Sequence, residues 1–140
     1  MKIVLYGNGG SGNHGCEAIV RGTFELLQES FLIASEAVEE DKKYGLEKLG
    51  DIYEAKTSKV NMVQLAKAYV KLKLTGNYTD MDGVPYLNFI DNVRGKADLA
   101  LSVGGDNYCY SNQSFYAFLN QAYQKKGIKT VLWGCSIEPD

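Results

Sequence analysis

The chain begins with a short apolar run that leads into a glycine-rich loop and then into a helical pattern, MKIVLYGNGGSGNHGCEAIVRGTFELL. Residues 2–6 are typical of a strand, and five of the nine residues from Gly7 to Gly15 are glycine. After the loop, apolar residues recur with the spacing of one helix face at Val20, Phe24 and Leu27. A strand, a tight loop and a helix in this order predict the opening unit of a parallel α/β domain.

The alternation of strands and helices continues along the chain. Further strands are predicted at residues 31–35, 52–55, 97–103 and 129–133. Helices are predicted at residues 39–48, where the helix is short and exposed, at 62–75, ending near Gly76, and at 115–126, with Ser114 as N-cap. Residues 78–95 contain Asp82, Gly83 and Pro85, and we expect an irregular connection with one or two helical turns there.

This pattern predicts an α/β fold, in which a Rossmann-like parallel sheet carries helices on both faces. The chain has 140 residues, of which 45% are hydrophobic, enough for a single domain spanning 1–140. The last residues, SIEPD, follow a predicted strand directly, where a doubly wound domain would place another helix. We therefore expect the domain to be truncated from a two-domain protein.

Composition and charge bear on several classes of function. A formal net charge of −2 gives no general basic field to collect nucleic acid or an anionic membrane. No apolar run is long enough for a transmembrane segment or a signal peptide, so we expect a cytoplasmic protein. The three cysteines, Cys16, Cys109 and Cys135, have no CxxC spacing, so they predict reduced thiols and no metal site.

The glycine loop allows several interpretations. It is not a Walker A loop, because Asn13 and His14 stand where lysine and serine or threonine are required. The spacing of Gly7, Gly9 and Gly12 matches the dinucleotide fingerprint, with Glu36 as a ribose-binding acid, but the loop is long for that role. Its exposed N–H groups could instead attract a phosphate or carboxylate, or let a sugar lie close to the backbone. A turn without a ligand is the simplest alternative.

Three segments together resemble the polysaccharide pyruvyl transferase family. GNGGSGNHGCEAIVRGT resembles the glycine-rich motif after the family's first strand, DLALSVGGDNYCY resembles an apolar strand ending in a glycine cluster, and VLWGCSIEP resembles a later strand ending in G-x-S-I-G-P. This chain has Cys16 in place of the usual Asp, Asp106 where a third glycine is common, and Glu138 before Pro139. All three motifs lie at the carboxyl ends of predicted strands.

The resemblance implies an enzyme of glycan or exopolysaccharide biosynthesis with a two-domain GT-B arrangement. Such transferases move pyruvate from phosphoenolpyruvate, the co-substrate, to two hydroxyls of a sugar or lipid-linked saccharide, forming a ketal, with no further cofactor implied. The donor-binding arginine and catalytic histidine of the family belong to a second domain, and this chain has only Arg21 and Arg94. We therefore expect the chain to form the acceptor side of the cleft and to be inactive alone.

The candidate site residues follow from the motif loops. His14 is the candidate acid or base because it is the only histidine and lies in the glycine loop. The candidate substrate-binding residues lie in the three motif loops: Gly9, Gly10, Gly12, Asn13, Gly15, Gly104, Gly105, Asp106, Asn107, Tyr108 and Ser136. Tyr110 is a further candidate for stacking on a sugar ring, and Trp133 is expected beside the crevice. The alternative function is a non-catalytic nucleotide- or dinucleotide-binding module that uses Glu36.

Overall fold

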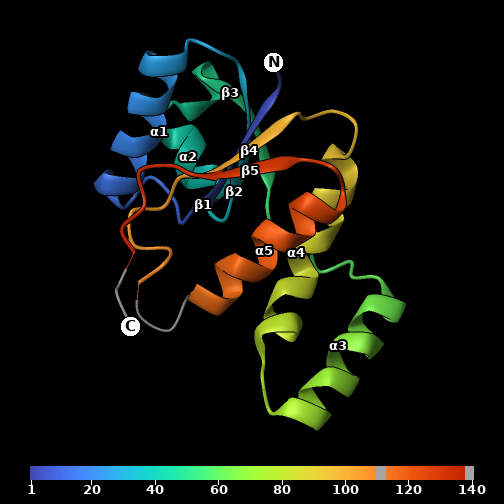
Figure 1. The fold of residues 1–140 in the computed structure, drawn as a ribbon. Coiled ribbons are helices and arrows are strands. Elements are labelled where there is room, and N and C mark those ends of the chain that lie inside the picture. Colours follow the sequence, from blue (N-terminus) through green and yellow to red (C-terminus); the bar gives the residue numbers. More distant parts are fainter. Residues whose placement is uncertain (110–112, 138–140) are drawn as a thin grey trace.

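The computed structural model describes residues 1–109 and 113–137, which form one sheet with helices on both faces (Figure 1). The sheet consists of five parallel strands in the order β3-β2-β1-β4-β5. The strands are β1 (Ile3–Asn8), β2 (Phe31–Ser35), β3 (Gly50–Glu54), β4 (Leu99–Ser102) and β5 (Lys129–Leu132). This confirms the predicted Rossmann-like α/β fold. The strand order reverses between β1 and β4, and this switch point is where open α/β sheets bind ligands, outside the carboxyl ends of the strands.

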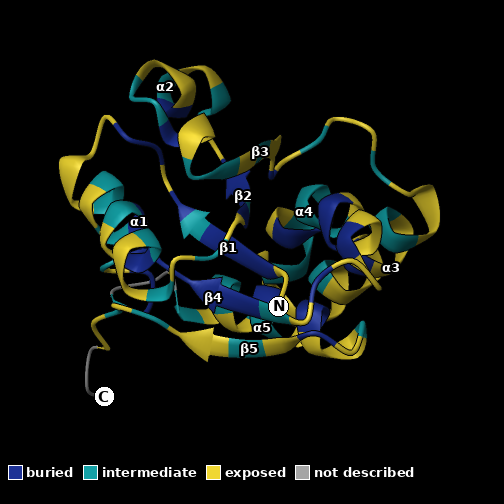
Figure 2. Ribbon diagram, turned by 90° about the horizontal axis from the view of Figure 1, so that it is seen from above, coloured by how far each residue is buried: buried dark blue, intermediate teal, exposed yellow. Residues whose placement is uncertain are grey.

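The helices divide between the two faces of the sheet. They are α1 (His14–Leu27), α2 (Val38–Lys43), the 3-10 turn η1 (Leu46–Lys48), α3 (Met62–Thr75), α4 (Thr79–Val93) and α5 (Gln113–Lys125). Helix α1 and the α2–η1 segment cover one face, and α4 and α5 cover the other (Figure 2). Helix α3 packs against α4 at the margin of the molecule. No helix of the described residues has both the length and the apolarity required to cross a bilayer.

Strand β1 is buried on both faces, as expected for a central parallel strand. Ile3 and Leu5 point to the α1 side, where they pack with Val20 and other side chains. Val4 and Tyr6 point to the α4–α5 side. Strand β1 therefore packs against the helices on both faces of the sheet, and this packing fixes the position of its carboxyl end.

The expectation of an irregular connection at residues 78–95 was wrong, because residues 79–93 form helix α4. The turn-forming residues serve packing instead. Gly83 is buried, and a Cβ atom there would overlap with the Phe118 ring of α5. Phe89 and Ile90 are buried against the sheet, so tertiary packing outweighs the low helix propensity of Gly83 and Pro85.

Other boundaries differ in smaller ways. The helix expected at residues 39–48 divides into α2 and η1, and it is not simply exposed, because Asp41 and Leu46 are completely buried. Ser114 lies inside α5 and is not its N-cap. The strand at 31–35 and the helix ending at Gly76, which adopts a left-handed conformation (φ 70°) as C-cap, are confirmed.

Candidate functional site

The loops after β1, β4 and β5 meet at the carboxyl edge of the sheet. The backbone N–H of Ser136 donates to the Gly105 carbonyl at 2.6 Å, which joins the loop after β5 to the loop after β4. Tyr108 and Ile137 form an isolated parallel bridge between the same loops. The three sequence motifs therefore lie around one edge, at the switch point next to β1.

Asn107 connects the ends of β1 and β4. It is only 4% exposed, and its amide nitrogen donates to the Gly7 carbonyl and to Ser102 Oγ, each at 3.3 Å. A Cβ atom on either Gly7 or Gly104 would overlap with this amide. The two glycines thus make room for Asn107, whose side chain holds two strand ends together and is turned away from solvent.

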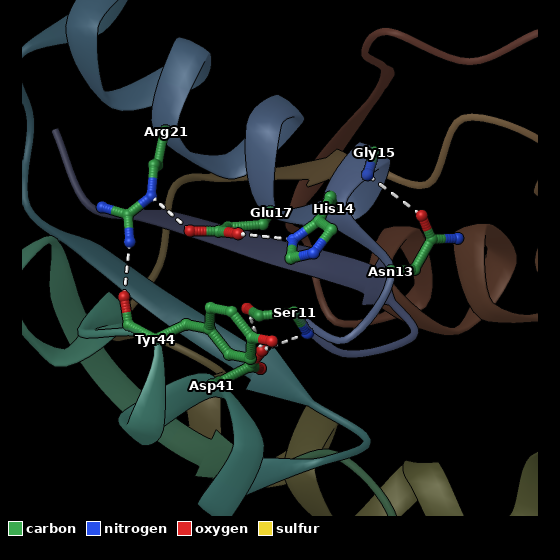
Figure 3. A network of polar contacts seen from close by, with 8 residues as sticks. All are labelled: Ser11, Asn13, His14, Gly15, Glu17, Arg21, Asp41 and Tyr44. Carbon is green, nitrogen blue, oxygen red and sulfur yellow. Dashed lines mark hydrogen bonds and ion pairs between the residues drawn. The ribbon is translucent and has the colours of Figure 1, made fainter.

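A buried carboxyl group fixes the glycine loop from the opposite side (Figure 3). Asp41 of α2 is fully buried, and its Oδ1 accepts from the Ser11 backbone N–H at 2.9 Å and from Ser11 Oγ at 2.6 Å. Its Oδ2 accepts from Ser35 Oγ at 2.5 Å and from Asn8 Nδ2 at 3.3 Å. Four donors satisfy both oxygens, so α2 and the ends of β1 and β2 hold the loop in one conformation.

A second carboxylate from α2, that of Glu40, lies directly against the glycine loop. A Cβ atom on Gly12 would overlap with this carboxylate, and one on Gly10 would lie 3.0 Å from its Oε2 and 2.8 Å from Ala37 Cβ. Gly10 also has a left-handed φ of 112°, whereas Gly9 is exposed with nothing within 4 Å of its Cβ position. Gly10, like Gly7 with its φ of 80°, is therefore a position that favours glycine for its conformation, and the place next to Gly12 already holds the Glu40 carboxylate.

The N-terminus of α1 carries the candidate His14. Asn13 is the N-cap, because its side-chain oxygen accepts from the Gly15 N–H at 3.0 Å. The His14 side chain is 75% exposed, and its Nδ1 lies 3.3 Å from Glu17 Oε2. Glu17 Oε1 in turn accepts from Arg21 Nε at 2.8 Å, and the hydrogen bonds from Arg21 and His14 lower the pKa of Glu17. Figure 3 shows this row of side chains along α1.

On the α4–α5 side, a carboxylate and two tyrosines lie near the ends of β2 and β4. Glu36 follows β2 directly. The residue as a whole is exposed, but desolvation of its carboxyl group raises its pKa, although the Tyr86 hydroxyl and Lys56 act in the opposite direction. Burial and then the charge of Glu36 raise the pKa of both Tyr86 and Tyr116, and Asp106 adds to the shift at Tyr116. Two negative charges therefore act at this part of the edge. Glu36 and Tyr86 also line a small pocket with Tyr6, Gly7 and Tyr123.

Tyr108 is buried, so its ring is not free to stack on a sugar. Its hydroxyl accepts from Asn120 Nδ2 at 3.0 Å, and Asn120 also accepts from the Tyr6 hydroxyl. Tyr110, the other stacking candidate, lies outside the described residues. Trp133 donates through Nε1 to Thr23 Oγ1 at 2.9 Å, which places it against α1 next to the loop after β5.

The cysteines and acidic side chains of the described residues offer no grouping of three or more ligands suited to a metal ion. The three cysteines are free thiols. Cys135 Sγ donates to the Ser102 carbonyl at 3.0 Å, and burial raises its pKa. The Cys109 thiol contacts the Ser136 carbonyl at 3.5 Å, so two of the three thiols help to hold the loops at this edge.

The structure thus brings together Gly104, Gly105, Asn107, Tyr108 and Ser136, while the side-chain contacts of His14 are with Glu17 and Tyr44. Sequence reasoning missed Asp41 and Glu40, which lie in the charged run VEEDKK and carry no motif signal of their own. Comparison with protein-family models, with curated proteins and with solved structures found no match.

Proposed function

We propose that the carboxyl edge of the sheet binds a saccharide acceptor and that the protein acts in pyruvyl transfer from phosphoenolpyruvate. The observation that supports this most is the meeting of the three motif loops at one edge, through Ser136, Gly105 and Asn107. These are the segments whose sequences resemble the pyruvyl transferase family. The proposal requires all three segments to lie around a single ligand.

The charges at this edge favour a neutral ligand that is rich in hydroxyls. Glu40 lies against the glycine loop, and Glu36 and Asp106 act on Tyr116 nearby. Carboxylates accept hydrogen bonds from sugar hydroxyls, whereas they repel a phosphate. The edge therefore suits the acceptor sugar better than it suits phosphoenolpyruvate.

The donor would need several converging cations, whereas the cation that acts on this edge among the residues discussed above is Lys56, through Glu36. Arg21 is held by Glu17 and by the Tyr44 carbonyl, and Arg94 is the C-cap of α4, before β4 begins and hence at the opposite edge of the sheet. In the proposal, the groups that bind phosphate and carboxylate come from a second domain.

The proposed reaction forms two C–O bonds at C2 of phosphoenolpyruvate and breaks the bond to phosphate. The two acceptor hydroxyls lose one proton each. One proton is balanced by the proton added to C3, which becomes the methyl group, and the other leaves with phosphate. Glu36 and His14 are the candidate bases for the attacking hydroxyl: Glu36 because its raised pKa makes it a better proton acceptor, and His14 because it pairs with Glu17.

A dinucleotide-binding module is the second candidate function, and the strand order favours it. The order β3-β2-β1-β4-β5 is that of dinucleotide-binding domains, and Glu36 follows β2, where the ribose-binding acid of such domains lies. Against it, Glu40 lies next to Gly10 and Gly12, where the pyrophosphate would approach. A negative charge at that point opposes dinucleotide binding.

The proposal is tested with phosphoenolpyruvate labelled with carbon-13 at C3 and a panel of saccharides. The protein encoded by the longest reading frame that contains these residues is expected to release phosphate and to form a product whose labelled methyl group gives the NMR signal of a ketal. Glu36→Gln and His14→Asn should each lower kcat, and the variant that removes the base should also lose the corresponding limb of the pH profile. The 140-residue chain alone is expected to release no phosphate. Absence of a ketal with every acceptor, alongside tight binding of NAD, would contradict pyruvyl transfer and support the module.

A further inference from the structure

Helix α3 has an apolar face that no described part of the chain covers. Met62, Val63, Val70 and Leu74 are 71%, 63%, 56% and 81% exposed, and together with Ala66 they line a shallow surface groove along the helix. Residues 62, 66, 70 and 74 are each four apart, so they lie on one side over the whole length of the helix.

The opposite side of α3 provides its contact with the rest of the molecule. Ala68 is buried and Leu72 is partly buried, and the helix packs against α4. The sequence has apolar residues at helical spacing at Met62, Leu65, Ala66, Tyr69 and Leu72. In the structure these residues do not share one buried face, because Met62, Ala66 and Tyr69 are exposed. The helix has more apolar surface than its packing on α4 uses.

Lysines lie on both margins of the exposed face. Lys67 and Lys71 follow one margin, and Lys73 lies on the other, with its Nζ 5.4 Å from the centre of the Tyr69 ring. Between residues 55 and 79 the sequence holds five lysines and no acidic residue, although the whole chain has a net charge of −2. This helix and its flanks therefore form a stretch of net positive charge in a chain that is negative overall, and Asp80, which pairs with Lys71 at 2.6 Å, is the first acid after it.

We propose that α3 docks on an anionic lipid bilayer, with its apolar face in the interfacial region and its lysines at the headgroups. An interfacial helix combines an apolar face with lysines whose aliphatic stems lie along the membrane while their ammonium groups reach the phosphates. Both ribbon views place α3 at the outer edge of the molecule, where a plane can reach it. The site is separate from the carboxyl edge of the sheet, and the inference does not rest on the proposed function.

The charges favour a membrane over the other occupants of such a face. A second copy of α3 would bring the lysines of the two helices together, and like charges repel. A groove on a protein partner would need acids along both of its walls to pair with lysines on both margins. An anionic bilayer presents negative charge on both sides of a helix that lies in its plane.

The test measures co-sedimentation of the 140-residue chain with vesicles of phosphatidylcholine alone and of an equimolar mixture with phosphatidylglycerol. Binding is expected only to the mixed vesicles and should weaken with salt. Leu74→Glu should abolish it, and the pair Lys67→Gln and Lys73→Gln should weaken it by about fivefold for each lysine. Circular dichroism of each variant should show an unchanged fold, because the altered side chains are exposed.

Matched controls lie on other elements. Leu26 of α1 is 73% exposed, so Leu26→Glu places the same charge at an equally exposed leucine, and Lys125→Gln removes a lysine from α5. Both controls should bind vesicles like the unmodified chain. Equal binding to neutral and mixed vesicles, or equal loss in Leu26→Glu, would overturn the proposal. A dimer in light scattering that Leu74→Glu dissociates, without vesicle binding, would overturn it in favour of contact between copies.

Discussion

Replacing Asp41 by alanine should destabilise the protein through the glycine loop. The carboxyl group accepts four hydrogen bonds, two from Ser11 and one each from Ser35 and Asn8. Hydrogen bonds to a charged group contribute about 1.5–3 kcal/mol each. Asp41 and its three donor residues are fully buried, so the alanine variant leaves these donors without a partner. Burying the carboxyl group itself costs desolvation energy that offsets part of the sum, so we expect a loss of about 3–5 kcal/mol in the free energy of unfolding. This corresponds to a fall in Tm of about 10 °C or more.

Urea denaturation of the unmodified chain and of Asp41→Ala measures this loss. Glu39→Ala is the matched control, since Glu39 lies on the same helix and its side chain is 89% exposed, and it should cost less than about 0.5 kcal/mol. In a background of Ser11→Ala and Ser35→Ala, Asp41→Ala should cost less, because two donors are already absent. The Ser11 amide should also lose its protection from hydrogen exchange. A loss below about 1 kcal/mol, with Ser11 still protected, would refute the role of Asp41.

Three further predictions concern the same edge of the sheet. Gly10→Val should destabilise by about 1–3 kcal/mol, because its φ is left-handed, whereas Gly9→Val should be close to neutral; similar melting temperatures for the two variants would contradict this. Gly104→Ala should lower the free energy of unfolding, and it should lower it less in an Asn107→Ala background, where the overlapping amide is absent. If the two changes in the free energy of unfolding simply add, the proposed packing of Asn107 against Gly104 is contradicted. Desolvation raises the pKa of Glu36 in the folded state, so ionisation of this group should lower the stability of the protein as the pH rises through that pKa. Glu36→Gln should therefore be more stable than the unmodified chain above this pH and not below it. A stability difference that does not depend on pH would contradict the raised pKa.

The sequence predicted the layers of the fold because its strong signals are local. The apolar run at residues 31–35 has the length and flanks of a strand, and the glycine after the third helix provides the C-cap. Helix α4 was missed because its apolar residues become decisive only when they meet the sheet and α5. In the sequence alone Gly83 and Pro85 are typical of a turn, whereas in the structure the missing side chain of Gly83 makes room for Phe118.

The candidate site was predicted to the level of loops but not of side chains. Loops at the carboxyl ends of parallel strands must lie at one edge, so the meeting of the residues around Gly105 and Ser136 could be expected. The inward position of Asn107 and the insertion of Asp41 under the loop depend on tertiary contacts between residues far apart in sequence. No local pattern distinguishes a buried aspartate from its exposed neighbours in VEEDKK.

The central claim, that the carboxyl edge takes a neutral saccharide and not an anion, is tested most directly by NMR titration of the nitrogen-15-labelled 140-residue chain. The reporters are the backbone amides of Gly12, Gly105 and Ser136, and the ligands are methyl glycosides of common hexoses, NAD, phosphoenolpyruvate and inorganic phosphate. We predict that at least one glycoside shifts these amides at millimolar concentration, which corresponds to about 4 kcal/mol, and that phosphoenolpyruvate binds no better than inorganic phosphate and more weakly than this glycoside. Shifts of the same amides by micromolar NAD or phosphoenolpyruvate, with no response to any glycoside, would contradict the account.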